Sequence, residues 1–394
     1  MIKVVWLAQY NVSTLQPQLK LNRQSTQHNS SWIHSLSDSL ALNKELELHI
    51  ITHSQLIDKT QVVEKNGIFF HVIKYNFPFS KKGFPGYFPY DKLTGYDYFR
   101  RKARRVIEKI APDILHVHGT EGGYFMPALR AKMPCIVSIQ GIISEYIKIE
   151  PSFAGFLQIP YEKTAVRKAK YFGCRTNFDH DFVRGINKDA VIFDLPEAMN
   201  MVFYNHHWKR PSQLSILFVG SLNKRKGIED LLLAMAKLKF LYPSIHLKVI
   251  GSGSKQYVDS LHGMVHKNNL ADNVSWLGTK SPSQIALEMS QTTLFVLPTL
   301  MDNSPNCLAE AMAVGIPSIA TRVGGIPSMI KHEIDGMLFE KHDVDGLVQI
   351  IRLLANDTNL QNRLSTNARE KAFNRNYPPS VADKYVEVYK SLLK

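Results

Sequence analysis

The sequence predicts an α/β protein with two doubly wound parallel-sheet domains, and three observations lead to that class. Short apolar runs bounded by turn residues alternate with helical stretches, and this order occurs twice along the chain. Such alternation is typical of parallel sheets with helices on both faces. The length of 394 residues exceeds what one hydrophobic core usually supports, and residues 195–214, with two prolines and no clear period, separate the two series. We therefore expect one domain over residues 1–195 and a second over residues 196–375.

The individual elements follow from the same pattern. In the first domain, apolar runs predict strands at residues 3–8, 46–52, 69–74, 114–118, 135–140, 171–174 and 190–193. Helices between these strands are predicted at residues 31–42, 98–110 and 160–168. In the second domain, strands are predicted at residues 215–220, 246–250, 274–277, 294–298, 316–320 and 336–339.

A short helix is predicted after the strand at 294–298. Ser304 is a good N-cap residue and Pro305 suits the first helical position, while Gly315 ends the helix. The helix dipole favours negative charge at this start, where unpaired backbone N–H groups belong to Asn306, Cys307 and Leu308. The segment therefore predicts an anion site, although capped helices of this kind are also ordinary punctuation in α/β proteins.

Two carboxylates flank the predicted helix start. Asp302 lies in the loop before it, and Glu310 lies eight positions later, about one and a half turns inside the helix. An acid on each side of an anion site suits a ligand with hydroxyl groups at both ends and phosphates between them. A nucleotide sugar has that layout.

A second loop adds positive charge. Lys226 and Gly227 open a helix after the strand at 215–220, and a lysine at a helix start can meet a diphosphate as a point charge. Residues 224–226 could instead be a solvated basic turn.

Gly251 and Gly253 follow the strand at 246–250, but position 256 is Gln, so the full dinucleotide-binding pattern of a dehydrogenase is missing.

Two histidines mark the first domain. His116 and His118 stand at the end of the predicted strand 114–118, and their side chains point the same way because the strand period is two. Lone histidines are more often structural than catalytic. A pair at the carboxyl edge of a parallel strand, followed by Gly-Thr-Glu-Gly-Gly, favours a functional site, with Glu121 as the nearby carboxylate.

The run from Thr299 to Gly325 resembles the signature of family 4 retaining glycosyltransferases, enzymes of the GT-B fold. The family pattern is an acid, seven residues, Glu, Ala-Met-Ala, a variable residue and Gly-x-Pro. Asp302 stands here for the commoner Glu, and Asn303-Ser304-Pro305-Asn306 replaces Gly-Phe-Pro-Asn. The resemblance covers nearly the whole chain, and the runs CRTNFDHD and LPEAMNMVFY resemble a subgroup associated with bacterial surface polysaccharides.

The resemblance implies two Rossmann-like domains facing a central cleft, the first for the acceptor and the second for the nucleotide-sugar donor. It implies that residues 376–394 form a helix that packs back on the first domain. Glu310 would hold the nucleotide ribose, Asp302 hydroxyl groups of the transferred sugar, and Lys226 the donor phosphates. Gly278 and Lys280 would lie beside the nucleobase. His118 matches a functional histidine of the family.

The remaining site residues are expected from the same resemblance. The donor-side positions are Gly220, Ser221, Arg225, Gly251, Gly253, Gly278, Lys280, Asn303, Ser304, Pro305, Asn306, Cys307 and Leu308. The family has Arg where Ser221 stands, so a second cation is missing, or Arg225 or Lys224 takes its place. On the acceptor side we expect His116, Glu121 and Gln140, the last standing where many relatives have His.

These expectations define a function. The chain would transfer a hexosyl group, with retention, from a nucleoside diphosphate sugar such as a UDP-sugar to a saccharide or lipid-linked saccharide acceptor. The product would belong to a bacterial surface polysaccharide such as the O-antigen of lipopolysaccharide, a capsule or an exopolysaccharide. No cofactor is expected beyond the nucleotide-sugar co-substrate. A sugar-nucleotide epimerase of the same double fold and a non-catalytic membrane-associated scaffold are the alternatives.

One motif competes for a metal. Asp179 and Asp181 form the Asp-x-Asp with which metal-dependent GT-A transferases hold a divalent ion against the diphosphate. The pair follows Thr176 and Asn177 at a predicted helix entry, where acids complement the helix dipole. We expect the helix-entry role and no metal.

Charge and composition suggest a location. The formal net charge is +14, but no nucleic-acid-binding motif accompanies it. Residues 80–105 mix aromatic groups with basic ones, as an interfacial segment on an anionic membrane would, and the basic residues include Lys81, Lys82, Arg100, Arg101, Arg104 and Arg105. A solvated basic helix beside packed aromatics is the alternative. Three widely spaced cysteines, no recognisable signal peptide and no long apolar run lead us to expect a cytoplasmic protein, peripheral on the inner face of the cytoplasmic membrane.

Overall fold

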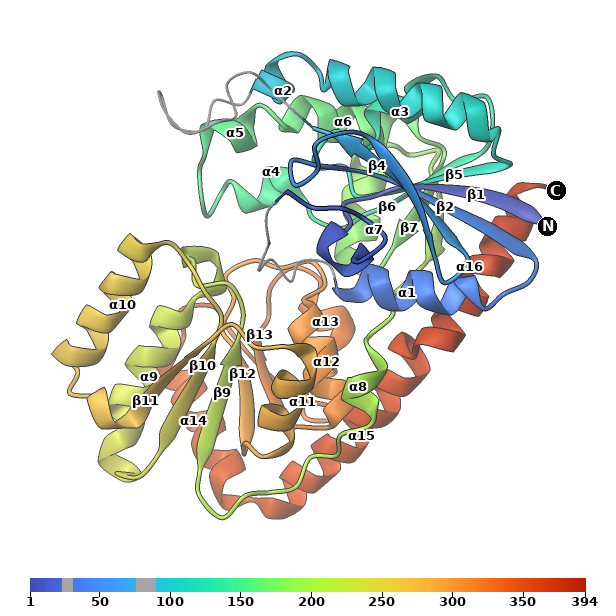
Figure 1. Cartoon of the computed structure of the whole chain (residues 1–394). Helices are drawn as coiled ribbons and strands as arrows, with labels where there is room; N and C mark the ends of the chain where they lie inside the picture. The colour runs from blue at the N-terminus through green and yellow to red at the C-terminus, as the bar shows by residue number, and fades with distance from the viewer. Residues whose placement is uncertain (23–30, 76–89) are drawn as a thin grey trace. The chain divides into compact units, whose positions relative to one another are not determined.

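The structure is a computed structural model that describes residues 1–22, 31–75 and 90–394. It divides into two compact units. The amino-terminal unit contains residues 1–198 and 378–394, and the carboxyl-terminal unit contains residues 199–377. The divisions therefore lie within three residues of the expected boundaries. Each unit is built on its own sheet with helices on both faces (Figure 1), as the α/β class predicts.

The sheet of the amino-terminal unit has the strand order β3-β4-β2-β1-β5-β6-β7-β8, with every pairing parallel except that of β3 with β4. The strands are β1 (Ile2–Leu7), β2 (Leu46–Ser54), β3 (Gln61–Lys65), β4 (Ile68–Lys74), β5 (Ile114–His118), β6 (Cys135–Ser138), β7 (Tyr171–Cys174) and β8 (Val191–Asp194). The helices are α1 (Ser31–Ala41), α2 (Tyr90–Leu93), α3 (Asp97–Ile110), α4 (Ile143–Tyr146), α5 (Phe153–Phe156), α6 (Ile159–Lys168), α7 (Asn177–Ile186) and α16 (Pro378–Leu392), with 3-10 turns at Val12–Leu15 and Met126–Arg130.

The last helix of the chain belongs to the amino-terminal unit. Helix α16 buries Tyr385 and Tyr389, and the Tyr389 hydroxyl accepts a hydrogen bond of 2.9 Å from Trp6 Nε1. Trp6 lies on β1, so the first strand and the last helix share one core. This is the packing that the family resemblance implies for residues 376–394.

The sheet of the carboxyl-terminal unit has the strand order β11-β10-β9-β12-β13-β14 and is parallel throughout. Its strands are β9 (Ser215–Val219), β10 (His246–Ile250), β11 (Val274–Gly278), β12 (Leu294–Leu297), β13 (Ser318–Thr321) and β14 (Met337–Phe339). Its helices are α8 (Met201–Tyr204), α9 (Ile228–Leu241), α10 (Lys255–Lys267), α11 (Pro282–Ser290), α12 (Asn306–Val314), α13 (Ile326–Met329), α14 (Val344–Asn356) and α15 (Thr358–Asn376), with 3-10 turns at Lys224–Lys226 and Ala271–Asn273.

Every predicted strand is present, with ends that differ by at most two residues. Central strands such as β9 and β12 are buried on both faces, so they read as continuous apolar runs. The prediction missed β3. This edge strand pairs antiparallel with β4 and leaves alternate residues exposed, so its polar sequence QVVEK carries little apolar signal.

Residues 195–214 were expected to connect the two domains, and the structure adds packed elements to this connection. The passage between the units falls at residues 198 and 199, and the rest of the segment packs on the carboxyl-terminal unit. It forms α8, buries Phe203 completely and places Trp208 so that its indole N–H donates to the Thr292 carbonyl at 2.8 Å. The burial of Phe203 and the hydrogen bond of Trp208 hold this segment on the carboxyl-terminal unit despite its irregular sequence.

Candidate functional site

The candidate donor site lies at the carboxyl ends of β9 and β12. These strands are neighbours, and the strand order reverses here, because β10 lies on the other side of β9. Loops that leave a parallel sheet at such a point diverge and leave room for a ligand. The loop after β9 leads to Lys226, and the loop after β12 leads to Asp302.

Close backbone contacts hold these two loops together. Gly227 has a positive φ of 64°, and a Cβ at this position would lie 2.1 Å from the Pro298 carbonyl oxygen. The Arg225 carbonyl accepts hydrogen bonds from the Leu300 N–H at 2.7 Å and from Thr299 Oγ1 at 3.0 Å. Only glycine fits at residue 227, and the turn before it is therefore clamped to the β12 loop.

Two cations from the first loop meet one acid of the second. Lys226 Nζ lies 2.5 Å from Asp302 Oδ2, and an Arg225 guanidinium nitrogen lies 3.4 Å from the same oxygen. Asp302 is 6% exposed. Ion pairs with these two cations offset the cost of burying this carboxylate.

Helix α12 begins one residue later than predicted. Pro305, not Ser304, is the N-cap residue, and its side chain makes no capping hydrogen bond. Because Pro305 has an extended backbone (φ −68°, ψ 116°), the Ser304 hydroxyl lies beyond capping reach and contacts Met329 Sδ at 3.7 Å. The Leu308 N–H, which was predicted to be unpaired, donates to the Pro305 carbonyl at 3.0 Å, so that the N–H groups at the start of α12 that precede this bond are those of Asn306 and Cys307. The Asn306 Oδ1 is buried without a hydrogen-bond partner among the described residues.

The second acid of the motif is buried in α12. Glu310 is 8% exposed, and burial raises the pKa of its carboxyl group to about 7. Burial likewise raises the pKa of the neighbouring Cys307 thiol to about 12, so this cysteine stays a neutral thiol. The surroundings of the two acids therefore differ, since two cations compensate the charge of Asp302.

The two glycines after β10 bring backbone against backbone. Gly251 has φ 146°, and a Cβ there would lie 1.8 Å from the Gly220 carbonyl oxygen. A Cβ on Gly253 would lie 2.0 Å from the Leu222 carbonyl oxygen. These glycines are needed because the backbone packs closely against the loop after β9. Close packing therefore accounts for the two glycines without a dinucleotide-binding role.

The other predicted donor-side positions are spread around this centre. Ser221 is exposed, and Asn303 is buried beside Asp302. Gly278 is exposed at the end of β11, where its carbonyl accepts from the Gly251 N–H at 2.9 Å, and Lys280 follows it. The nucleobase role of Gly278 and Lys280 stays a prediction.

In the amino-terminal unit, His116 and His118 point the same way, with ring centroids 4.0 Å apart. His116 Nδ1 lies 2.7 Å from the Tyr389 hydroxyl and Nε2 lies 2.8 Å from Ser138 Oγ. Burial lowers the pKa of His116 to about 3, so this ring is a neutral structural link between β5, β6 and α16.

His118 differs from His116 because its ring is buried without hydrogen bonds. Neither ring nitrogen has a partner among the described residues, and the same is true of Thr120 Oγ1 and Glu121 Oε2. Burial, together with His116 and Arg175, holds the pKa of His118 well below its ordinary value. Burial raises the pKa of Glu121 to about 7. Buried polar groups without partners point to a ligand that hydrogen-bonds to them.

Arg175 is the main residue of this region that sequence reasoning missed. It is 6% exposed, pairs with Glu197 at 3.0 Å and donates to the Gln140 carbonyl. Thus Gln140 contributes a backbone oxygen to the cluster. The sequence offered one signal for this residue, which is an arginine directly after an apolar strand and before Thr-Asn.

The Asp-x-Asp motif forms a helix entry, as expected. Thr176 is the N-cap of α7, and its hydroxyl accepts from the Asp179 N–H at 3.3 Å. Asp179 is fully buried and accepts from the Arg175 N–H at 3.0 Å, whereas the Asp181 side chain is 83% exposed. The two carboxylates therefore do not share a face.

In residues 1–22, 31–75 and 90–394, no three His, Cys, Asp or Glu side chains are grouped so that they could hold a metal ion. No helix there combines the length and apolar character that crossing a membrane requires.

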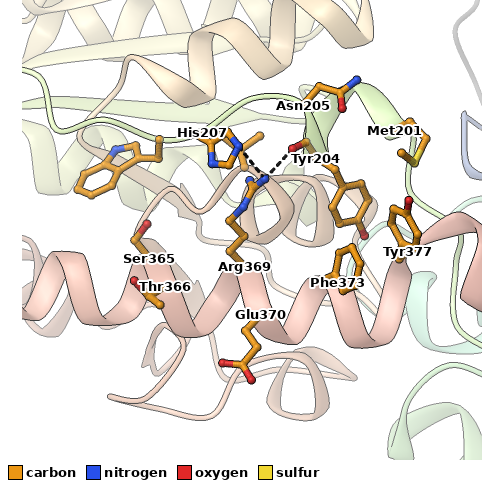
Figure 2. Close-up of a pocket in the computed structure, with 12 residues that line it drawn as sticks. Met201, Tyr204, Asn205, His207, Ser365, Thr366, Arg369, Glu370, Phe373 and Tyr377 are labelled. Carbon is orange, nitrogen blue, oxygen red and sulfur yellow. Dashed lines mark hydrogen bonds between the residues drawn. The ribbon is translucent and has the colours of Figure 1, made fainter.

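A cavity of about 650 Å³ lies between residues 201–208 and α15 (Figure 2), and it contains none of the predicted site residues. Arg369 crosses it and donates to the carbonyls of Tyr204 and Ala313, both at 2.6 Å. Val314, at the carboxyl end of α12, lines the cavity, so the cavity is separated from the donor site by the length of that helix. Arg369 thus ties α8, α12 and α15 together.

Comparison with known proteins identifies the chain. Residues 205–371 match the family model "Glycosyl transferases group 1", and residues 25–176 match "Glycosyl transferase 4-like". N-acetyl-alpha-D-glucosaminyl L-malate synthase of Bacillus anthracis is 24% identical over 370 residues, which cover 88% of this chain and 90% of that protein. The amylovoran biosynthesis glycosyltransferase AmsK of Erwinia amylovora is 30% identical over 227 residues, 56% of this chain and 53% of that protein.

A solved structure supports the fold. The Anabaena protein Alr3699/HepE, in complex with UDP and glucose, has a TM-score of 0.73 and 16% sequence identity, with 99% of this chain and all of that chain covered. With glycosyltransferase family models matched in both halves of the sequence and two sheet-based α/β units in the structure, this chain is a glycosyltransferase of the GT-B fold.

Proposed function

We propose that this glycosyltransferase moves a hexosyl group, with retained anomeric configuration and without a metal ion, from a nucleoside diphosphate sugar to a saccharide or lipid-linked saccharide. The observation that carries this proposal is the cluster at the ends of β9 and β12. There the uncapped start of α12 lies in the loop system that also holds Lys226, Arg225 and Asp302. Backbone donors, a cation and two carboxylates are what a sugar–diphosphate–ribose ligand requires.

The leaving group determines the chemistry on the donor side. As the glycosidic bond opens, negative charge develops on the diphosphate. Lys226 and the N–H groups at the start of α12 would stabilise that charge, and preorganised donors of this kind are each worth about 2.7–4 kcal/mol. With these groups as the charge-stabilising elements, the proposed reaction does not call for a divalent ion.

Retention follows from the face of attack in this proposal. The acceptor hydroxyl attacks the anomeric carbon from the side of the departing diphosphate, and a phosphate oxygen takes its proton. A double displacement would need a carboxylate beneath the anomeric carbon. Glu121 is the candidate for that role, and its burial in the amino-terminal unit favours a hydrogen-bonding role instead, because a protonated carboxyl group is a poor nucleophile.

The acceptor would bind to the amino-terminal unit. His118, Thr120 and Glu121 offer buried polar atoms without partners among the described residues, which suits the hydroxyl groups of a saccharide. AmsK takes part in amylovoran biosynthesis, and the Anabaena neighbour binds UDP and glucose. On this basis we propose a UDP-hexose donor and a product in bacterial surface polysaccharide, such as O-antigen, capsule or exopolysaccharide.

Replacing either donor-site residue tests the assignment. Lys226→Ala and Glu310→Ala should each lower turnover of the preferred nucleotide sugar by ~100-fold or more, because single electrostatic contacts in active sites carry such factors. The measurement is product formation from UDP-, GDP- and dTDP-sugars in excess chelator, with the product identified as a glycoside.

The control for this experiment is Lys255→Ala, which removes a lysine from the same unit whose side chain is 90% exposed. It should keep wild-type turnover. Unchanged rates in folded Lys226→Ala and Glu310→Ala proteins would refute the site, and an isomerised nucleotide sugar in place of a glycoside would indicate the epimerase. Activity that disappears with the chelator would refute metal independence.

The raised pKa of Glu310 predicts a pH dependence of donor binding. Ribose hydroxyls donate to an ionised carboxylate, so the affinity for a UDP-sugar should rise as pH increases through about 7. If binding needs the ionised form, the dissociation constant at pH 6 should be ~10-fold higher than at pH 8. Titration calorimetry with the nucleotide sugar measures this, because its diphosphate diester does not titrate in this range.

Glu310→Gln is the matched variant for this titration, and its affinity should vary little between pH 6 and 8.

The pH dependence of unfolding gives a second readout for Glu310. The folded-state pKa of Glu310 lies above the ordinary value of 4.5, so Glu310 lowers the free energy of unfolding progressively as pH rises from about 4.5 to about 7. Glu310→Gln should remove that decline. An equal pH dependence in both proteins would contradict the role given to this carboxyl group.

We further propose that the amino-terminal unit docks on the anionic inner face of the cytoplasmic membrane. Lys81, Lys82 and the aromatic residues near them lie outside the described residues. On α3, Arg100 and Arg101 pair with Asp97, and Arg104 donates to the Pro127 carbonyl at 3.2 Å. Arg101, despite this ion pair, and Arg105 are exposed.

Exposed apolar side chains accompany this basic helix. Leu93 on α2 is 50% exposed, and Phe153 and Phe156 on α5 are 65% and 53% exposed. Tyr161, at the start of α6, donates to the Lys92 carbonyl and so ties α2 to the segment that follows α5. Apolar anchors beside exposed cations are what interfacial binding requires.

Vesicle flotation tests the membrane proposal. Binding to vesicles with phosphatidylserine should exceed binding to phosphatidylcholine vesicles and fall with added salt. Arg101→Glu/Arg105→Glu should weaken it by ~30-fold or more, at roughly 1 kcal/mol per basic group. Lys255→Glu is the control in the other unit. Binding that ignores lipid charge and salt would contradict the proposal.

A further inference from the structure

Two cations converge on one oxygen of a buried acid. Asp302 Oδ2 lies 2.5 Å from Lys226 Nζ and 3.4 Å from the Arg225 guanidinium. The side chains of Lys226 and Arg225 are 12% and 16% exposed, so solvent screens these pairs little. The two neighbouring cations nevertheless differ in how they are held.

Arg225 is anchored to the β12 loop at both ends. Its carbonyl accepts from the Leu300 N–H at 2.7 Å and from Thr299 Oγ1 at 3.0 Å. Its guanidinium donates to the Met301 carbonyl at 2.9 Å, next to its contact with Asp302. Arg225 therefore cannot leave Asp302 without breaking contacts with the residues that carry Asp302.

The ammonium group of Lys226 is held differently. Within the part of the chain that the structure describes, Nζ donates one hydrogen bond, to Asp302 Oδ2. The rest of the side chain is a flexible stem, and an ammonium is a compact charge that exchanges one anionic partner for another readily. Lys226 is thus the cation of the pair that can turn to a phosphate.

A turn of Lys226 toward a diphosphate changes the environment of Asp302. The acid loses its nearest cation while negative charge arrives close by, and a buried carboxylate without a counter-ion is strongly disfavoured. The exposed Ser221, where the family pattern has Arg, supplies no cation here. A second cation is needed that stays with Asp302.

We propose that Arg225 is a positioning residue that holds the Asp302 carboxylate in place during donor binding and so releases Lys226 to the diphosphate. This inference rests on the donor role proposed for Lys226. It assigns Arg225 to Asp302, and through Asp302 to the hydroxyl groups of the transferred sugar, instead of to the phosphates.

Thermal denaturation of the ligand-free protein tests the pairing without any substrate. Lys226→Ala imitates the state in which the lysine has left, and its melting temperature should stay near that of the wild type because Arg225 remains. Arg225→Ala/Lys226→Ala should melt roughly 10 °C lower, since it leaves Asp302 without either cation. Adding Asp302→Asn should restore most of that loss. A loss that persists in the Asp302→Asn background would overturn the pairing.

Ligand binding separates a positioning role from phosphate binding. The probes are UDP, GDP and dTDP, measured by titration calorimetry, together with turnover of their sugars. Arg225→Ala should keep the affinity for the preferred nucleoside diphosphate within about twofold, whereas Lys226→Ala loses it. Turnover by Arg225→Ala should fall ~10- to 100-fold, and Arg225→Lys should recover part of it.

A double-mutant cycle completes the test. If Arg225 acts through Asp302, Arg225→Ala should cause no further loss of turnover in the Asp302→Asn protein. Multiplied losses, or a tenfold weaker nucleotide affinity in Arg225→Ala, would overturn the inference and make Arg225 a phosphate ligand. If none of the three nucleotides binds the wild type, the donor proposal fails, and the denaturation experiment alone decides whether Arg225 supports Asp302.

Discussion

The ion cluster of Asp302 with Lys226 and Arg225 depends on the pairing of β9 with β12. These strands are 78 residues apart at the paired positions Ile216 and Leu294, and their hydrogen bonding brings the loops that follow them together. Gly227 then allows the two loops to touch, since any side chain there would collide with the Pro298 carbonyl. The strand order therefore determines which loops meet at the site, and the charged side chains of these loops determine which ligand can bind there.

The two carboxylates of the site are accommodated in different ways. Asp302 is buried with cations, so its charge is compensated within the protein. Glu310 is buried in α12, where burial raises its pKa to about 7 and the neutral form is favoured. Ribose hydroxyl groups at Glu310 would stabilise its ionised form, whereas a diphosphate that draws Lys226 away would leave Arg225 to compensate the charge of Asp302. A donor with a ribose at one end and a sugar at the other offers hydroxyl groups to both acids.

Much of this arrangement could be predicted from the sequence, and the failures have physical causes. The buried parallel strands leave continuous apolar runs, and the acids, the lysine and the glycines lie in loops whose positions follow from those strands. Ser304 failed as an N-cap because the extended backbone of Pro305 moves the helix start. Strand β3 failed because an exposed edge strand carries no apolar period.

Long-range partners were beyond sequence reasoning altogether. The contact of Tyr389 with His116 joins residues 273 positions apart, and no local pattern marks it. The same is true of Arg175, whose partners Gln140 and Glu197 come from separate loops. A local period identifies elements, whereas the polar contacts that tie a functional site together depend on the complete topology.

The most direct test of the central claim is a crystal structure of the protein with a bound UDP-sugar. The diphosphate oxygens should lie ~3 Å from the backbone nitrogens of Asn306 and Cys307 and from Lys226 Nζ, with Glu310 on the ribose and Asp302 on the sugar. A diphosphate bound away from the start of α12, or acids that contact neither end of the ligand, would contradict the account.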